Sequence, residues 1–107
     1  MHFIQFLYSA ELGRMWYGGR MDVKRAEKIV KGFSNHHRIR TLILLQKDPD
    51  LTLNEIADKL RLNFRTTSEH TKKLVASGLI AKRYKGSTVQ HQLTELGEDI
   101  LKFCKKL

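Results

Sequence analysis

Apolar side chains recur at three- and four-residue intervals in five stretches of the chain, which is the spacing of one helix face. In the first stretch Gly32 is expected to end the helix, and in the fourth Gly78 suits the left-handed position that follows a helix. The pattern predicts four helices before the hairpin region and one after it: residues 22–31, 35–46, 53–60, 65–77, and a last helix that Thr94 caps.

Polar residues that can cap helices stand at the predicted boundaries. Thr52 and Glu55 have the spacing of a capping box, in which the hydroxyl and the carboxylate each accept a hydrogen bond from an exposed amide at the helix start. Asn63 can cap the helix that follows a short turn, and either Ser34 or Asn35 can cap the second helix. These caps support the predicted helix starts.

The hydrophobic period changes after the fourth predicted helix. Val89, His91 and Leu93 would lie on one face of an extended segment, with polar residues between them on the other face. This alternation is typical of a strand, and a second short strand precedes it. The segment is therefore expected to form a β-hairpin, with strands and loop at residues 80–84, 88–93 and 85–87.

The predicted order is helix, helix, helix, helix, hairpin, helix. Two helices joined by a tight turn and followed at once by a basic hairpin are typical of a winged helix-turn-helix. We therefore expect a mainly α fold with a small β-hairpin, in which a three-helix core and its wing are flanked by N- and C-terminal helices. This domain is predicted to span residues 22–107.

Residues 1–21 form an apolar segment ahead of this domain. Phe3, Phe6, Leu7 and Ala10 could line one face of a short helix. One interpretation is an accessory helix that packs on the domain or contacts a second copy of the chain. The other is an upstream extension or loose tail, and the sequence leaves both open.

Composition further limits the number of domains, the kind of partner and the location of the protein. A chain of 107 residues with 41% apolar residues suits one domain with a thin core. Its net charge of +9 favours a polyanionic partner, nucleic acid before an anionic membrane surface. The lone cysteine, Cys104, excludes an intrachain disulfide and fits a cytoplasmic location. No apolar run reaches the ~18 to 20 residues of a membrane span.

The predicted helix over residues 65–77 presents hydrogen-bonding and cationic side chains outward. At about 100° per residue, Thr67, Thr71 and Leu74 point toward the core. The N-terminal part of a helix in the major groove reaches deepest, and arginine pairs with guanine while lysine reaches the backbone. We expect Arg65, Thr66 and Glu69 to read bases, and Ser68, His70, Lys72 and Lys73 to contact phosphates.

Positive charge concentrates in this helix and hairpin. Between residues 61 and 85 seven cationic side chains stand against Glu69 alone, a net charge of +6. A solvated polar face without function would carry mixed signs. The tip of the hairpin can lie along the DNA backbone or minor groove, although it is also an ordinary turn sequence. The wing residues expected to contact DNA are Arg83, Lys85, Gly86 and Ser87.

From about Ser34 to Gly97 the chain resembles the ArsR-type winged-helix regulators. That family has a Ser-x-His at the recognition helix, matched by Ser68 and His70, and a Gly-Leu-Ile exit with an Arg and a Gly in the wing. The resemblance implies a DNA-binding transcriptional regulator, usually a repressor. The chain departs from the family at Thr71, where leucine is usual, and at His91, where an aromatic is frequent.

No metal site, cofactor or active site is predicted. Many ArsR-type members sense metals through cysteines in the helix that corresponds to residues 53–60, and this segment contains none. The last helix offers only carboxylates and one cysteine. Ser68, Glu69 and His70 are triad residue types, but adjacent helical positions point about 100° apart and cannot form a relay. We therefore expect a protein that is not an enzyme.

Double-stranded DNA and a second copy of the chain are the expected partners. A homodimer would place two recognition helices in successive major grooves, about 34 Å apart. The alternative is a winged helix that contacts another protein, without sequence-specific DNA binding. The dimer is expected to form through the N-terminal helices and an apolar stripe on the last helix: Leu96, Ile100, Phe103 and Leu107.

Overall fold

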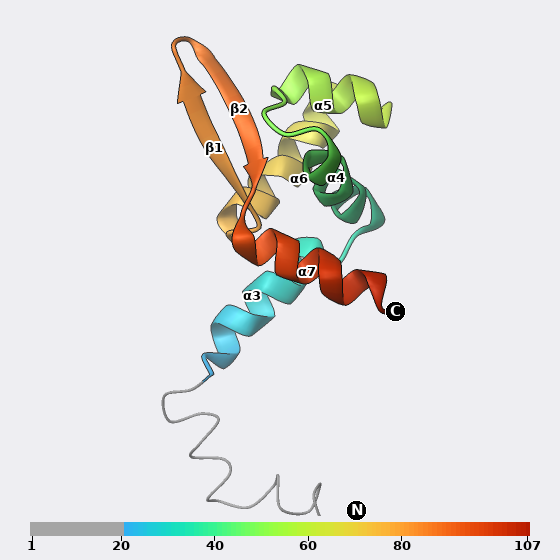
Figure 1. Cartoon of the computed structure of the whole chain (residues 1–107), viewed down its shortest axis with the longest axis vertical. Helices are drawn as coiled ribbons and strands as arrows, with labels where there is room; N and C mark the ends of the chain where they lie inside the picture. The colour runs from blue at the N-terminus through green and yellow to red at the C-terminus, as the bar shows by residue number, and fades with distance from the viewer. Residues whose placement is uncertain (1–20) are drawn as a thin grey trace, which may run out of the picture.

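The computed structural model describes residues 21–107, which form five helices and one antiparallel hairpin (Figure 1). The predicted N-terminal accessory helix falls on residues 1–20, outside the described part of the chain. The order of elements agrees with the prediction, so the expected winged helix-turn-helix fold is confirmed. In chain order the elements are α3 (Val23–Phe33), α4 (His36–Lys47), α5 (Leu53–Leu60), α6 (Phe64–Ala76), β1 (Ile80–Lys85), β2 (Thr88–Leu93) and α7 (Glu95–Lys105).

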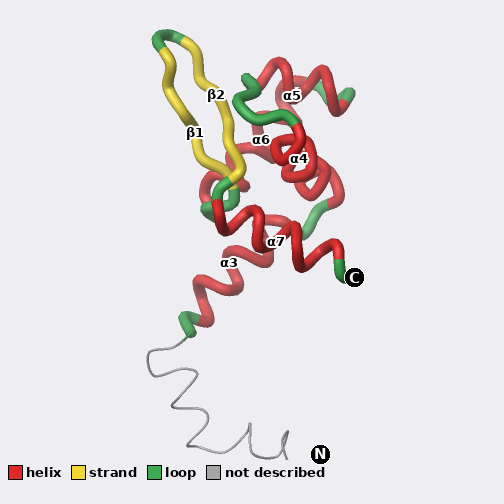
Figure 2. Tube along the Cα trace, in the orientation of Figure 1, coloured by secondary structure: helices red, strands yellow, loops and turns green. Residues whose placement is uncertain are grey.

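The core lies where α4, α5 and α6 meet the base of the hairpin and α7. Each fully buried leucine or isoleucine in it contributes about 1.5–3 kcal/mol through the hydrophobic effect. In the hairpin, β2 lies on the side of the helices and is mostly half-buried, whereas β1 lies on the outer side and is exposed from its second residue on (Figure 2). The side chains that form the centre of the core are Leu42, Leu45, Ile56, Leu74, Leu79, Ile80 and Leu101.

The predicted caps set the starts of the helix-turn-helix. The Thr52 hydroxyl accepts a hydrogen bond from the Glu55 amide at 3.3 Å, and the Thr52 amide donates to Glu55 Oε1 at 2.8 Å. The Asn63 side chain accepts from the Thr66 amide at 2.7 Å and so begins α6. Asn35, one of the two predicted candidates, caps α4. These local bonds satisfy amides that no helix could satisfy internally.

Gly32 differs from the prediction, because it lies inside α3 instead of ending it. It is buried, and a Cβ at this position would come within 2.6 Å of the Ser77 Cβ. The close approach lets the end of α3 pack directly on the end of α6. The glycine therefore marks a contact between two helices, which helix periodicity alone does not reveal.

The hairpin agrees with the prediction, except that its loop is shorter by one residue. Lys85 pairs with Thr88, which leaves Gly86 and Ser87 as a two-residue turn. Gly86 has a φ of +62°, a value that favours glycine. Gly78, which precedes β1 by two residues, has a φ of +80°, as its predicted place after α6 requires.

The base of the hairpin is attached to the loop between α4 and α5. The His91 amide donates to the Leu51 carbonyl at 2.9 Å, and the Asp50 amide donates to the His91 carbonyl at 3.1 Å. The His91 ring adds a hydrogen bond from Nδ1 to the Leu51 carbonyl at 2.9 Å, and Gln92 Nε2 donates to the Asp50 carboxylate. These bonds fix the direction of the hairpin relative to the helices.

The apolar stripe predicted on the last helix divides between the core and the surface. Leu96 and Ile100 pack partly against the core, whereas Phe103 is 54% exposed and Leu107 is 88% exposed. The residue of α7 that enters the core most fully is Leu101, which the predicted stripe omitted. Within residues 21–107, no helix is long and apolar enough to cross a membrane.

Candidate nucleic-acid interface

The first turns of α6 carry an exposed cation and an exposed acid, as predicted. The Arg65 side chain is 92% exposed, and its Nε lies 3.6 Å from Glu69 Oε1 one turn later. An exposed ion pair of this kind contributes little to stability, so a ligand can replace it at small cost. Thr66 is half-buried, and its amide donates a hydrogen bond to the side chain of the N-cap Asn63.

The rest of α6 separates into a buried side and an exposed side. Thr67, Thr71 and Leu74 are buried, in agreement with the helical spacing. Lys72 and Lys73 are exposed, and Ser68 is half-buried at the edge. Arg65, Glu69 and the two lysines are therefore exposed on the outer surface of α6, whereas Thr66 is half-buried.

His70 is placed differently from the prediction. Its ring lies 5.7 Å from the ring of His37 on α4, and its Nδ1 is buried without a hydrogen-bond partner. Burial lowers the pKa of His70, and the positive charges of Arg38, His37 and Lys73 lower this pKa further, although Glu69 raises it. An inward-facing ring whose pKa is lowered is a weaker cationic contact for phosphate than the exposed lysines. Since His70 is four residues before Leu74, its helical position already favours this inward orientation.

The wing presents its predicted contacts to solvent. Arg83, Lys85, Gly86 and Ser87 are all exposed, and a Cβ at Gly86 would meet no atom within 4 Å. The sequence interpretation missed Tyr84, whose side chain is 72% exposed between two cations. An aromatic residue beside lysine and arginine on an exposed strand is a signal that could have identified it.

A pocket of about 410 Å³ lies between α6 and the hairpin. Ser68 and Lys72 line it from α6, and Lys82 lines it from β1. The buried hydroxyl of Thr71 and the ring of His91 form part of its wall, and Thr71 Oγ1 has no hydrogen-bond partner. Side chains of α6 and of the hairpin therefore line one shared pocket, in which polar groups stand beside the apolar Leu53 and Val89.

A second concentration of positive charge lies outside the segment that the sequence interpretation singled out. Residues 21–47, which include α3 and α4, carry seven cationic side chains against Asp22 and Glu27, a net charge of +5. Residues 48–60, by contrast, have a net charge of −3. Because Gly32 packs α3 against the end of α6, cations of α3 lie near a cation of α6: Lys28, Lys31 and Lys73 line the same hollow.

The described residues do not gather metal ligands. No three side chains among the His, Cys, Asp and Glu of residues 21–107 are arranged to hold a metal ion. The rings of His36 and His37 have centroids 4.0 Å apart and are tilted by 40°, and His70 is near His37, but no acid or thiol completes a site. Cys104 is a free, half-buried thiol on α7.

A protein-family model described as winged helix-turn-helix DNA-binding matches residues 34–81. The matched segment contains α4, α5 and α6 and ends just inside β1. No curated protein sequence matches the chain. The family match therefore covers α5, α6 and the turn between them.

Several solved structures are similar to the chain. NolR from Sinorhizobium fredii has a TM-score of 0.71 and 21% identity over 92% of this chain and 91% of its own. The homodimeric winged helix-turn-helix DNA-binding domain of a possible ArsR-family transcriptional regulator from Mycobacterium bovis has a TM-score of 0.71 and 20% identity, over 78% and 77%. The transcriptional regulator HlyU from Vibrio vulnificus has a TM-score of 0.64 and 26% identity, over 78% and 88%.

Proposed function

The described residues form a winged helix-turn-helix domain that resembles ArsR-type regulators, and from this premise we propose that the chain binds duplex DNA as a homodimer and regulates transcription. The observation that carries the proposal is the exposure of cationic side chains on the outer face of α6 and on β1, within a segment, residues 61–85, whose net charge is +6. In this proposal α6 enters the major groove and the wing lies on the adjacent backbone. Repression is the expected outcome, in the cytoplasm and without catalysis.

The proposed contacts follow from exposure and chemistry. Arg65, Thr66 and Glu69 stand at the start of α6, the part of a recognition helix that reaches base edges. Replacing the exposed Arg65–Glu69 pair by contacts to bases costs little, because water already screens that pair. Phosphate contacts are assigned to these exposed or half-exposed groups: Ser68, Lys72, Lys73, Arg83, Lys85 and the turn at Gly86 and Ser87.

Homodimerisation is supported by apolar surface at both ends of the domain. Phe103 on α7 and Leu107, which follows that helix, are exposed, and on α3 Val23 and Val30 are each about half exposed. Exposed apolar side chains in a domain with so thin a core gain stability when a second copy covers them. The Mycobacterium bovis neighbour is itself described as homodimeric.

Substituting Arg65 and Lys73 separately will distinguish base reading from backbone contact. Arg65→Ala is expected to weaken binding to the selected sequence by about 5- to 150-fold for each half-site and to relax preference at one base position of each half-site. Lys73→Ala is expected to weaken binding to all sequences alike, because phosphates carry no sequence information. The measurement is selection of bound duplexes from a random pool, followed by fluorescence anisotropy with matched and scrambled duplexes.

This selection also tests the proposal as a whole. A wild-type protein that enriches no sequence and binds no duplex would contradict DNA binding and favour a winged helix used for protein contact. If both variants bind every duplex as wild type does, α6 is not the reading helix. Unchanged circular dichroism spectra of the variants serve as the control for folding.

Placing a charge on the exposed stripe of α7 will test the dimer. Phe103→Glu is expected to convert the dimer to a monomer in sedimentation equilibrium at micromolar concentration, since two carboxylates would be buried at a symmetric contact. Asn54→Glu, which adds the same charge at an exposed position on α5, is the matched control and should remain dimeric. A monomeric wild-type protein would overturn the dimer proposal.

A further inference from the structure

A second hollow of about 250 Å³ lies between α3, α4 and α6, away from the wing. Four cationic side chains line it: Lys28 and Lys31 from α3, Arg38 from α4 and Lys73 from α6. Gly32 and Ser77, the two residues whose close packing joins α3 to α6, form part of its wall. The hollow therefore lies beside the close contact between α3 and the end of α6.

Arg38 is the unusual member of this set. Its side chain is buried, with the residue only 8% exposed, yet it forms no ion pair with any carboxylate of residues 21–107. One terminal nitrogen donates to the Lys31 carbonyl at a long 3.4 Å, and Nε is buried with no hydrogen-bond partner. A guanidinium has five N–H donors, and burying its charge without an anion is costly.

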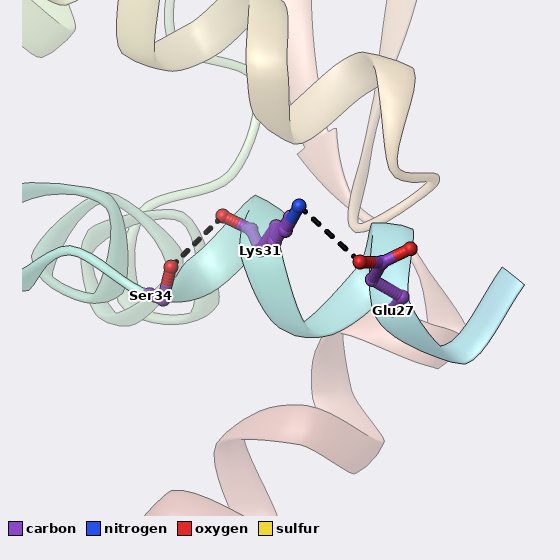
Figure 3. Close-up of polar contacts among 3 residues, drawn as sticks. All are labelled: Glu27, Lys31 and Ser34. Carbon is purple, nitrogen blue, oxygen red and sulfur yellow. Dashed lines mark hydrogen bonds and ion pairs between the residues drawn. The ribbon is translucent and has the colours of Figure 1, made fainter. Parts of the chain in front are cut away.

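The surrounding lysines add charge instead of compensating it. Lys31 Nζ is paired with Glu27 at 3.3 Å, and the Lys31 carbonyl accepts a hydrogen bond from the Ser34 hydroxyl at 3.1 Å (Figure 3). Lys28 and Lys73 have no ion-pair partner within the described part of the chain. After the Glu27 pair is counted, three positive charges remain around one small hollow.

A purely structural role explains only part of this arrangement. Arg38 could serve to cap α3, because the Lys31 carbonyl is in the last turn of that helix. This contact uses one donor of the guanidinium and leaves Nε unsatisfied. It gives no reason for Lys28 and Lys73 to line the same hollow.

We propose that this hollow is a binding site for a phosphate group. Arg38 would offer its planar fork to two phosphate oxygens, and Lys28 and Lys73 would each offer one ammonium from opposite walls. The phosphate can be supplied by a free monoester or inorganic phosphate, or by a phosphodiester of bound DNA. The first source is independent of the proposed function, and the second rests on it.

The neighbouring His70 provides a reporter. Burial lowers its pKa most, and the positive charges of Arg38, His37 and Lys73 lower the pKa further, while Glu69 raises it. An anion bound to Arg38 and Lys73 would offset those two charges. The pKa of His70 should therefore rise when the site is filled, a change that a cap on α3 would not produce.

The first experiment uses the whole chain, inorganic phosphate and no DNA. Phosphate replaces chloride at constant ionic strength, while NMR follows the His70 ring and circular dichroism follows unfolding. We expect saturable shifts, a higher pKa of His70 and, at about ten times Kd, a Tm raised by roughly 5 °C. Lys28→Gln should weaken binding about threefold to fivefold. Lys47→Gln, at an exposed position on α4, is the matched control and should bind as wild type does.

Arg38→Lys keeps the charge but not the fork, and it should weaken phosphate binding more than Lys28→Gln does. If Arg38→Lys fails to fold, Lys28→Gln alone decides, because Lys28 is exposed and does not support the core. Phosphate shifts that do not saturate, or that Lys28→Gln leaves unchanged, exclude a free phosphate as the ligand.

The second experiment identifies a DNA phosphate as the source. If a phosphodiester fills the hollow, Lys28→Gln should lower the slope of log K against log salt by about 2 for a dimer. Binding of free phosphate without a change of slope would assign the site to a small phosphorylated ligand. The proposal is overturned if neither experiment responds to Lys28→Gln. A protein that binds phosphate but no DNA would refute the proposed function and leave this site standing.

Discussion

Duplex DNA is expected to bind this protein about a thousandfold more weakly at 200 mM salt than at 50 mM salt. Four cations per protomer are assigned to phosphate contacts: Lys72, Lys73, Arg83 and Lys85. If three of them neutralise one phosphate each, a dimer releases the counterions of about six phosphates, which gives a slope near −5 in log K against log salt. Fluorescence anisotropy at several salt concentrations measures this slope.

Removing one wing cation should change the slope by a defined amount. Lys85→Ala removes two phosphate contacts per dimer, so the slope should become shallower by about 2. Lys47→Ala removes an equal charge from the end of α4, at a position that the proposal does not place on DNA, and should leave the slope unchanged. Binding that is insensitive to salt would refute the groove-reading interface and favour the protein-contact alternative.

The largest expected loss of stability comes from a single added methyl group at Gly97. This buried glycine lies in the first turn of α7, and a Cβ there would collide with the Leu79 carbonyl oxygen and lie 2.6 Å from Leu93 Cδ1. Because the first obstacle is backbone, side-chain rotation cannot relieve it. Gly97→Ala should therefore lower the free energy of unfolding by about 3 kcal/mol, and Tm by about 15 °C.

Gly86→Ala is the matched control for this substitution. A Cβ at Gly86 would meet no atom within 4 Å, so only the strain of its positive φ remains, a cost of about 1 kcal/mol. Thermal unfolding followed by circular dichroism compares the two variants. Equal losses would show that α7 does not press against the strand region as closely as the structure indicates.

Local chemistry explains why much of the fold could be predicted. The Thr52–Glu55 box and the Asn63 cap act within three residues, so the sequence specifies the starts of α5 and α6 directly. The buried stripe Thr67, Thr71 and Leu74 follows from the helical period. The base-reading candidates on α6 could be assigned for the same reason, because they are the complement of that stripe.

Features that depend on packing between distant segments could not be predicted in this way. Gly32 has the sequence signature of a helix end, but its contact with Ser77 requires knowledge of how α3 crosses α6. The charge count over residues 61–85 missed Arg38, which reaches the same region from α4. The helical position of His70 indicates its inward orientation, but its proximity to His37, more than thirty residues earlier in the chain, depends on how α4 packs on α6.

The attachment between the hairpin and the loop at Asp50 and Leu51 has a consequence for how DNA preference can change. Asp50 adopts a φ of +68°, and both residues hold the base of β2 through hydrogen bonds. The angle between the wing and α6 therefore depends on a hydrogen-bonded loop whose residues are not among the proposed DNA contacts. Related proteins could adapt to operators of different width by changes in this loop, while the protein side chains that contact the DNA stay the same.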